Sequence, residues 1–303
     1  MISLTRSHTT FDLASLARSD LEESALGFLQ RLQKRTGETN LCLVGGVAQN
    51  SVLNGRIARE AGFDQVFIPP YPGDEGIALG CAAYARSLLL PSDTEVAARW
   101  TRNVPFSAYQ GRAYSQEEVA AAIDEYMPWL DEVMLDDPSE AGVVEYASEA
   151  LAGGEILCWA YGKAEVGARA LGHRSILADP RAPTTHKRVN TIKRREQYRP
   201  LAPSVLSEEA DGWFDGVPSL GSPYMQITAA VRPEVQEKVP AITHVDGSAR
   251  LQTVAASDVP LYHALILAFF ALSGGEQHTP QGLPTRVRVA AHALAAAHTR
   301  IGA

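Results

Sequence analysis

Residues 155–175, EILCWAYGKAEVGARALGHRS, decide the fold class of this chain. Residues 155–161 form a short apolar run that ends at a glycine and predicts a buried β-strand. The glycine-rich stretch after it carries Arg169 and Arg174, five positions apart with a glycine between them. This spacing is too irregular for a solvated helix face, so we expect loops whose guanidinium groups bind phosphate or carboxylate oxygens. For Arg169 the alternative is a structural salt bridge to Glu165.

Strands and helices alternate on both sides of this stretch. Apolar residues at helical spacing, and short apolar runs ended by glycine or proline, together predict an α/β fold. Residues 91–115 show no clear period, which predicts a linker. The expected helices cover residues 11–35, 50–61, 77–90, 116–127, 139–152 and 261–272, and the expected strands cover 40–44, 65–69, 155–161, 224–228 and 251–254.

The composition is that of a soluble globular protein. The 303 residues are 46% hydrophobic and 20% charged, with a formal net charge of -8. This charge argues against non-specific nucleic-acid binding, although a local arginine cluster can still attract anions. The N-terminus lacks the apolar core of a signal peptide, and no later run could span a bilayer, so we expect a cytoplasmic protein without a membrane partner. Cys42, Cys81 and Cys158 lie in apolar runs, which predicts buried reduced thiols.

Two glycine-containing turns follow the first two expected strands. Gly45 and Gly46 allow backbone amides to approach a ligand, and a helix is expected to begin at Asn50, so this turn is a candidate nucleotide site. The alternative is a tight turn without a ligand. Asp74 lies in the second turn, where a carboxylate could hold a metal that bridges nucleotide phosphates. Its alternative role is the N-cap of the following helix.

Further cations lie downstream. They are Lys193, Arg194, Arg195 and Arg199, which follow Asn190, and Arg250, which ends the segment DGSAR. With Arg169 they predict a cleft in the second domain for a small phosphorylated anion. The alternative for residues 193–195 is a solvated basic turn, and we favour it for Arg194 and Arg195.

Four blocks resemble the signature blocks of the carbamoyltransferases of nodulation factors and antibiotic tailoring. They are LCLVGGVAQNSVLNGRI (41–57), PPYPGDEGIALGCAAYA (69–85), GKAEVGARALGHRSILADPR (162–181) and NTIKRREQYRPLAPSVL (190–206). Their order and spacing agree over roughly residues 11–272. The resemblance implies an incomplete actin-like ATPase (ribonuclease H-like) lobe at 1–95, a linker at 96–112, and at 113–274 a smaller α/β domain resembling the threonylcarbamoyl-adenylate synthase fold.

The resemblance also implies a chemistry. In this family the second domain takes up carbamoyl phosphate, and the first joins the carbamoyl group to ATP as carbamoyl-adenylate. The group then passes to a hydroxyl of a small-molecule acceptor, in natural-product or nodulation-factor biosynthesis, with a divalent, iron-type metal in place. By matching position, the resemblance implies that Arg169 and Lys193 are catalytic and that Asp74 is the metal ligand. It implies that the nucleotide contacts are Gly45, Gly46 and Asn50. The implied carbamoyl-phosphate ligands are Arg169, Arg174, Ser175, Lys193, Arg199 and Arg250.

The sequence departs from the family pattern at both ends. The family's first domain begins earlier and carries the metal-binding histidines there, so we expect an incomplete metal site and a separate N-terminal lobe as a candidate partner. Residues 275–303 shift toward Ala, Arg and His. They are either a basic helix that docks on a partner or out-of-frame translation, and we favour the second. Because a family strand is replaced there, we expect an unpaired apolar sheet edge.

Three functional hypotheses follow. The chain is one part of a carbamoyltransferase that is active with its N-terminal partner, or a truncated, catalytically inactive remnant, or an anion- or nucleotide-binding module without transfer activity. The altered tail favours the remnant. The acceptor cannot be identified from these residues, because its pocket would lie largely in the earlier part of the family's first domain.

Overall fold

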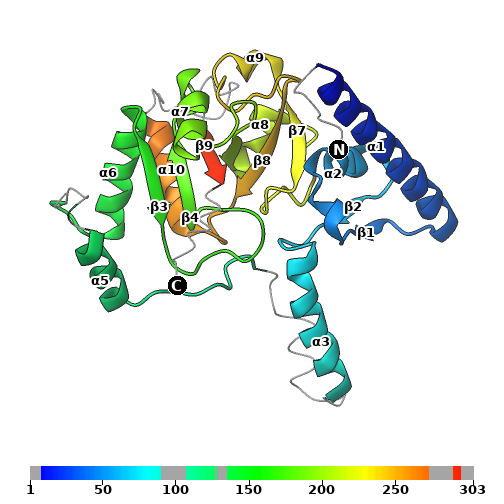
Figure 1. Ribbon diagram of the computed structural model, residues 1–303, viewed down its shortest axis with the longest axis horizontal. Coiled ribbons are helices and arrows are strands. Elements are labelled where there is room, and N and C mark those ends of the chain that lie inside the picture. Colours follow the sequence, from blue (N-terminus) through cyan, green and yellow to red (C-terminus); the bar gives the residue numbers. More distant parts are fainter. Residues whose placement is uncertain (1–7, 90–106, 127, 129–134, 273–288, 295–303) are drawn as a thin grey trace, which may run out of the picture.

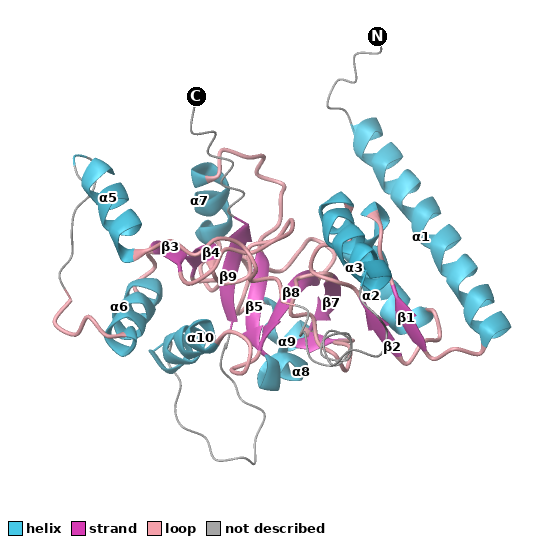
Figure 2. Ribbon diagram, turned by 90° about the horizontal axis from the view of Figure 1, so that it is seen from below, coloured by secondary structure: helices cyan, strands magenta, loops and turns pink. Residues whose placement is uncertain are grey.

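The computed structural model describes residues 8–89, 107–126, 128, 135–272 and 289–294. It has two α/β units, which lie side by side in Figures 1 and 2. The first holds a two-stranded sheet of order β1-β2, and the second a seven-stranded sheet of order β3-β4-β9-β5-β8-β7-β6. The expected mixed α/β class is confirmed. The tail at 275–288 and 295–303 and the linker residues 96–106 lie outside the described residues.

The first unit follows the expected order of elements. It consists of α1 (His8–Thr36), β1 (Asn40–Cys42), the 3-10 turn η1 (Gly46–Gln49), α2 (Ser51–Glu60), β2 (Gln65–Phe67), the 3-10 turn η2 (Asp74–Gly76) and α3 (Ile77–Leu89). The two strands are parallel. Leu26 and Leu29 of α1 pack with Leu53 and Ile57 of α2 in one buried cluster. Helix α3 extends away from both units (Figure 1).

The second unit is a sheet covered on both faces. Its helices are α5 (Gln116–Tyr126), α6 (Glu140–Ala152), α7 (Thr184–Ile192), α8 (Ala210–Trp213), α9 (Pro233–Gln236) and α10 (Pro260–Leu272), with the 3-10 turn η4 (Ser207–Glu209). Its strands are β3 (Ile156–Ala160), β4 (Arg174–Ala178), β5 (Ala202–Leu206), β6 (Phe214–Asp215), β7 (Ile227–Val231), β8 (Ser248–Val254) and β9 (Val289–Leu294). Leu151 and Phe269 belong to the core cluster beneath α6 and α10, while Trp213 and Val235 belong to a second cluster with α8 and α9.

The expectation of an unpaired sheet edge is wrong. Strand β9, which comes from the basic tail, lies between β4 and β5 and is antiparallel to both. Figure 1 shows it in red at the centre of the sheet. The extended backbone of 289–294 also excludes a helix for this part of the tail. A tail of altered composition can therefore still complete the ladder, because backbone pairing does not depend on side-chain identity.

The two units meet where α2 packs on β7. The side chain of Asn54, which is fully buried, donates hydrogen bonds to the carbonyls of Ala48 (2.7 Å) and Gln226 (2.9 Å). Gly55 is needed here, because a Cβ at this position would lie 2.3 Å from the carbonyl oxygen of Thr228. Arg59 donates to that same carbonyl at 3.1 Å. The first unit is thus fixed against the strand that neighbours β8.

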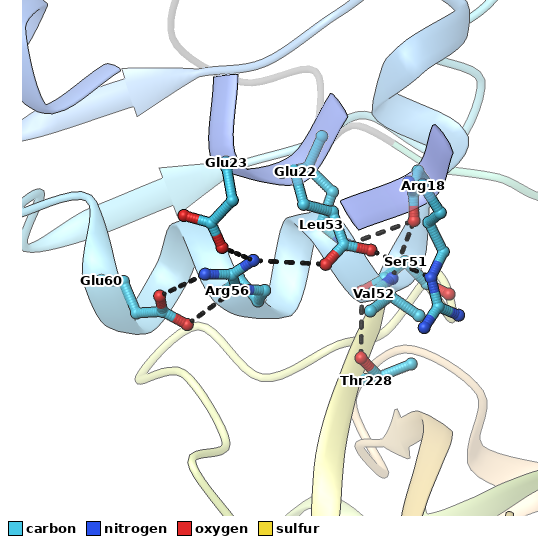
Figure 3. A network of polar contacts seen from close by, with 10 residues as sticks. Arg18, Glu22, Glu23, Ser51, Val52, Leu53, Arg56, Glu60 and Thr228 are labelled. Atoms are coloured by element: carbon cyan, nitrogen blue, oxygen red, sulfur yellow. Dashed lines mark hydrogen bonds and ion pairs between the residues drawn. The ribbon is translucent and has the colours of Figure 1, made fainter. Parts of the chain in front are cut away.

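Helix α1 is joined to α2 by charged groups (Figure 3). Arg56 of α2 lies between Glu22 and Glu23 of α1 and Glu60 of its own helix, with N···O distances of 3.3, 2.8 and 3.0 Å. These acidic neighbours raise the pKa of Arg56, Glu60 being the main cause. The long first helix is therefore held by a local ion-pair network in addition to its apolar stripe.

Two smaller expectations fail. Cys42, Cys81 and Cys158 are exposed, not buried. Strand β7 begins three residues later than expected, since Met225 has φ 57° and interrupts the extended backbone. No helix among the described residues is long and apolar enough to cross a membrane.

Candidate anion cleft and nucleotide turn

The three glycine-containing turns predicted to carry the chemistry lie together. The amide of Gly45 donates to the carbonyl of Pro72 at 2.7 Å, which joins the first turn to the second. Gln49 Nε2 donates to Glu75 Oε1 at 3.1 Å across the same junction. Arg169 from the third turn donates to the carbonyl of Gln49 at 3.3 Å. The first two turns thus lie together, and Arg169 of the second unit reaches the first of them.

The candidate nucleotide residues differ in their availability. Gly45 has φ 101°, a backbone conformation that favours glycine, and the space beside Gly45 and Gly46 is open. Asn50 is instead the N-cap of α2, since its Oδ1 accepts from the amides of Val52 (3.2 Å) and Leu53 (3.1 Å). A capping side chain of this kind already satisfies orphan donors of the helix. The amide of Gly45 is also engaged, with Pro72, and its carbonyl accepts from the amide of Ala48 at 2.9 Å. What this turn leaves open to a ligand is therefore the space beside its two glycines.

Asp74 is exposed and its carboxylate makes no hydrogen bond or ion pair with any described residue. The N-cap alternative is therefore wrong, and Gly73 precedes the 3-10 turn in the cap position. The residues that the structure describes hold no group of three or more His, Cys, Asp or Glu side chains that could bind a metal ion. A protein metal site usually needs about three ligands, so these residues alone do not fit the implied iron-type metal.

The expected alternative for Arg169 is also wrong. Glu165 forms no ion pair with Arg169; its Oε1 accepts from the amides of Leu171 (2.6 Å), His173 (2.9 Å) and Arg174 (3.2 Å). The carboxylate thereby shapes the loop before β4. Arg169 is free to point toward the first turn, and burial lowers its pKa while the charge of Glu75 opposes that shift.

Arg174 and Ser175 have structural partners. The guanidinium of Arg174 donates to the carbonyls of Tyr161 (2.9 Å), His173 (2.7 Å) and Gly162 (3.0 Å), which ties the turn between β3 and β4. Ser175 is buried, and its Oγ accepts from the amide of Gly172 at 3.0 Å. The structure therefore places these two predicted ligands in the backbone framework of the site.

Lys193 and Arg250 have no such partners. Both residues are partly buried, Lys193 Nζ and Arg250 Nε are fully buried atoms, and neither side chain makes a hydrogen bond or ion pair with any described residue. Burial, followed by the charges of Arg195 and Arg250, lowers the pKa of Lys193 to about 8. Burial and the charges of Arg169 and Arg195 lower the pKa of Arg250. Uncompensated buried cations are costly, so this pair calls for a bound anion.

The surroundings of Arg195 and Arg199 are the reverse of those expected. Arg199 is exposed, and its Nε lies 2.7 Å from Glu196 Oε2, which raises its pKa. Arg195, expected to be solvated, is partly buried, and its Nε donates to Asn190 Oδ1 at 2.6 Å. Arg194 is exposed, as expected. Charge spacing alone could not separate these arginines, because the difference depends on the turn after α7.

A cavity of about 630 Å³ lies beside Arg250, between the two units. Arg250 lines it from β8, and Arg18 and Ser51 line it from the first unit. Two histidines missed at the level of sequence, His186 and His244, line it as well. Burial lowers the pKa of His244. We call this cavity, with Lys193 and Arg250, the anion cleft.

The fold and the anion cleft together define the structural class of this protein. The chain is a two-unit α/β protein with a cationic cleft and a glycine-rich turn where the units meet. The family model described as Carbamoyltransferase N-terminus matches residues 4–83, and the one described as Carbamoyltransferase C-terminus matches residues 148–277. The chain belongs to the carbamoyltransferase family.

Individual relatives agree with this membership. The chain is 38% identical over 264 residues to Nodulation protein NolO of Bradyrhizobium diazoefficiens, covering 85% of this chain and 45% of the relative. It is 36% identical over 265 residues to Nodulation protein NolNO of Sinorhizobium fredii, covering 87% of this chain and 37% of the relative. Nodulation protein U of B. diazoefficiens is 34% identical over 259 residues, covering 86% and 41%. The chain thus spans less than half the length of these relatives.

Proposed function

We propose that this chain takes up carbamoyl phosphate in the anion cleft, as part of a carbamoyltransferase that carries the carbamoyl group to a hydroxyl of a small molecule. The observation that carries the proposal is the pair Lys193 and Arg250, two cations whose side-chain nitrogens Nζ and Nε are buried and have no partner among the described residues. A bound phosphate group would supply the missing counter-charge. It would form charge-assisted hydrogen bonds, which are roughly twice as strong as neutral ones.

Arg169 links this uptake to the nucleotide turn. Its guanidinium reaches the carbonyl of Gln49, and its charge acts on Arg250. We therefore assign Arg169 and Lys193 the catalytic roles: both would lie beside a phosphate whose negative charge must be offset when a second anion approaches. Arg199 would join only if its ion pair with Glu196 opened.

ATP is the proposed co-substrate, and carbamoyl-adenylate the proposed intermediate. The backbone of Gly45 and Gly46 would approach the nucleotide, beside the N-terminus of α2, which favours negative charge. With this function we also propose that the first unit is part of an actin-like lobe and that the second unit is related to threonylcarbamoyl-adenylate synthase. No step is assigned to a metal, since the described residues do not form a site for one.

An N-terminal carbamoyltransferase lobe is the proposed protein partner. The described residues of the first unit form a two-stranded parallel sheet, and parallel sheets are normally covered on both faces. Large apolar side chains are exposed around it: Val44, Val47, Ile77, Tyr84, Leu88 and Leu89. A surface of this kind marks an interaction site. The relatives are more than twice as long as the aligned part of this chain, which is consistent with additional structure that covers this face.

Binding and transfer can be tested separately. Carbamoyl phosphate and inorganic phosphate should each raise the melting temperature of the whole chain, and Lys193→Gln and Arg250→Gln should abolish this effect. Lys187→Gln, which removes an exposed lysine of α7, is the control. Carbamoylation of a hydroxyl acceptor with ATP should then require addition of the N-terminal portion of a relative. Binding without transfer would support the anion-binding module, and no binding would support the inactive remnant.

A further inference from the structure

Asn190 and Arg195 form a polar unit at the C-terminal end of α7. Asn190 is fully buried, and its Oδ1 accepts from Arg195 Nε at 2.6 Å. Its backbone carbonyl accepts from the amide of Arg195 at 3.1 Å, and its Nδ2 donates to the carbonyl of Arg199 at 2.9 Å. Arg195 Nη2 also donates to the carbonyl of Pro200 at 3.3 Å. One buried amide therefore fixes both ends of the turn 195–200.

This turn is a wall of the anion cleft. Gln197, Tyr198 and Pro200 line the same cavity as Arg250. Just before the turn, Arg194 has φ 48°, in the left-handed region, and the backbone there changes direction. Arg194 remains exposed while Arg195 is partly buried. Two adjacent arginines thus have different environments at the start of a turn that lines the cavity.

Part of the Arg195 guanidinium is hydrogen-bonded within the protein and part is not. Nε and Nη2 are bound to Asn190 and Pro200, whereas Nη1 makes no hydrogen bond or ion pair with any described residue. Burial lowers the pKa of Arg195, and its charge lowers the pKa values of Lys193 and Arg250. Three cations therefore interact at one place, and no acidic side chain among the described residues forms an ion pair with any of them.

We propose that Arg195 is a further anion-binding residue of the anion cleft and that Asn190 is the residue that positions it. This inference rests on the proposed function of the cleft and adds a residue to it. The bound group would be a phosphate, since a guanidinium fork held at one edge offers its remaining N–H groups in a fixed plane. Anchoring by Asn190 lowers the conformational entropy lost on binding.

The test uses the full chain, inorganic phosphate as the probe and titration calorimetry at low ionic strength. Arg195→Gln should weaken phosphate binding about tenfold or more, as expected for loss of a charge-assisted hydrogen bond. Arg194→Gln is the matched control, with the same charge change at the adjacent exposed position, and should alter affinity less than about twofold. Asn190→Asp keeps the acceptor oxygen but sets a carboxylate against Arg195, and should weaken binding as Arg195→Gln does.

A pH series tests whether the charge of Arg195 acts on the site, whereas the affinities above test whether Arg195 itself binds the anion. Phosphate affinity of the native chain should fall as Lys193 loses its proton near pH 8. In Arg195→Gln one of the two charges that, together with burial, lower the pKa of Lys193 is gone, so the fall should move to higher pH. In Arg194→Gln it should stay in place. If Arg195 only stabilised the turn and its charge did not act on the site, the pH dependence of phosphate affinity would be the same in Arg195→Gln as in the native chain.

The outcomes are distinct. If Lys193→Gln and Arg250→Gln lose phosphate while Arg195→Gln binds like the native chain with an unshifted profile, Arg195 only braces the turn and the inference is overturned, although the proposed function stands. If the native chain binds no phosphate, the proposed function fails and the inference fails with it. Should Arg195→Gln not fold, native affinity in Asn190→Asp would overturn the inference by itself.

Discussion

The hydroxyl of Thr228 donates to the carbonyl of Ser51 across 3.2 Å, and these residues are 177 positions apart in the chain. Thr228 is the register partner of Arg250 on the neighbouring strand. Ser51 directly follows Asn50, the cap that ends the nucleotide turn. The contact, drawn in Figure 3, therefore connects the strand beside the anion cleft to the helix beside the nucleotide turn. A substitution at this junction should therefore alter the structure of both sites.

Two glycine-to-alanine variants test the junction. Gly55→Ala places a Cβ against the Thr228 carbonyl oxygen, at 2.3 Å without relaxation, and should destabilise the chain by about 1–3 kcal/mol. Gly80→Ala in α3 meets nothing within 4 Å, and should stabilise by about 0.5–1 kcal/mol through helix propensity. Chemical denaturation of both variants gives the comparison. Equal effects of the two substitutions would contradict the close approach of α2 to β7.

Phosphate binding should depend on the protonation of Lys193. The folded-state pKa is about 8, so the ammonium form that attracts an anion is depleted above that pH and affinity should fall. Lys193→Arg keeps the charge across this range, and its affinity should not fall at the same point. Calorimetric titration at several pH values on either side of 8 provides the measurement. A decline of equal size and position in both proteins would assign it to another group.

Lys193→Met should stabilise the anion-free chain by about 1–2 kcal/mol, because it removes a poorly compensated cation from a partly buried position. The effect has a defined sign with pH. Because the pKa of Lys193 falls from 10.5 to about 8 on folding, the unfolded chain binds more protons between these values, and native stability gains as pH rises through that window. The Met variant should lack this gain. Thermal unfolding at two pH values checks both statements, and the variant should no longer bind phosphate.

The sequence predicted the first unit closely because its signals are local. Glycine, proline and apolar periodicity gave α1, α2 and α3 with ends within a few residues of those observed. Strand β5 was missed because it contains Pro203, and proline is unusual inside a sheet. Strand β9 could not be predicted from a tail with few β-branched residues, since its position depends on pairing with two strands distant in sequence.

The site was predictable as a set of residues but not as a set of roles. Lys193, Arg169 and Arg250 come together as expected. In contrast, the guanidinium of Arg174 donates to backbone carbonyls, and that of Arg199 forms an ion pair with Glu196. A sequence shows that a guanidinium is present, whereas its function depends on which acceptors the fold leaves within reach. Asn50 illustrates the same limit, because an asparagine before a helix serves equally well as a cap or as a ligand.

Divalent metal should not stabilise this chain by itself. Asp74 is an exposed carboxylate outside any group of three metal-binding side chains in the described residues. Addition of Fe²⁺, Mn²⁺ or Mg²⁺ at millimolar concentration should leave the melting temperature unchanged within about one degree. Asp74→Asn should behave identically. A saturable increase that Asp74→Asn abolishes would show a metal site and would contradict this prediction.

Glu165 is expected to organise the cleft without contacting an anion. Its Oε1 accepts from the amides of Leu171, His173 and Arg174 where the chain enters β4, so Glu165→Ala would leave these donors unpaired and should cost about 2 kcal/mol or more of stability. Glu165→Gln retains a carbonyl oxygen in the same place and should lose less, since hydrogen bonds to a charged acceptor are the stronger ones. Glu149→Ala, at an exposed position on α6, is the control. Because the loop that Glu165 shapes presents Arg169, phosphate affinity should fall in the order native, Gln, Ala. If affinity fell in Glu165→Ala but Glu165→Gln lost equally, the negative charge itself, and not the hydrogen-bond geometry, would be what the loop requires.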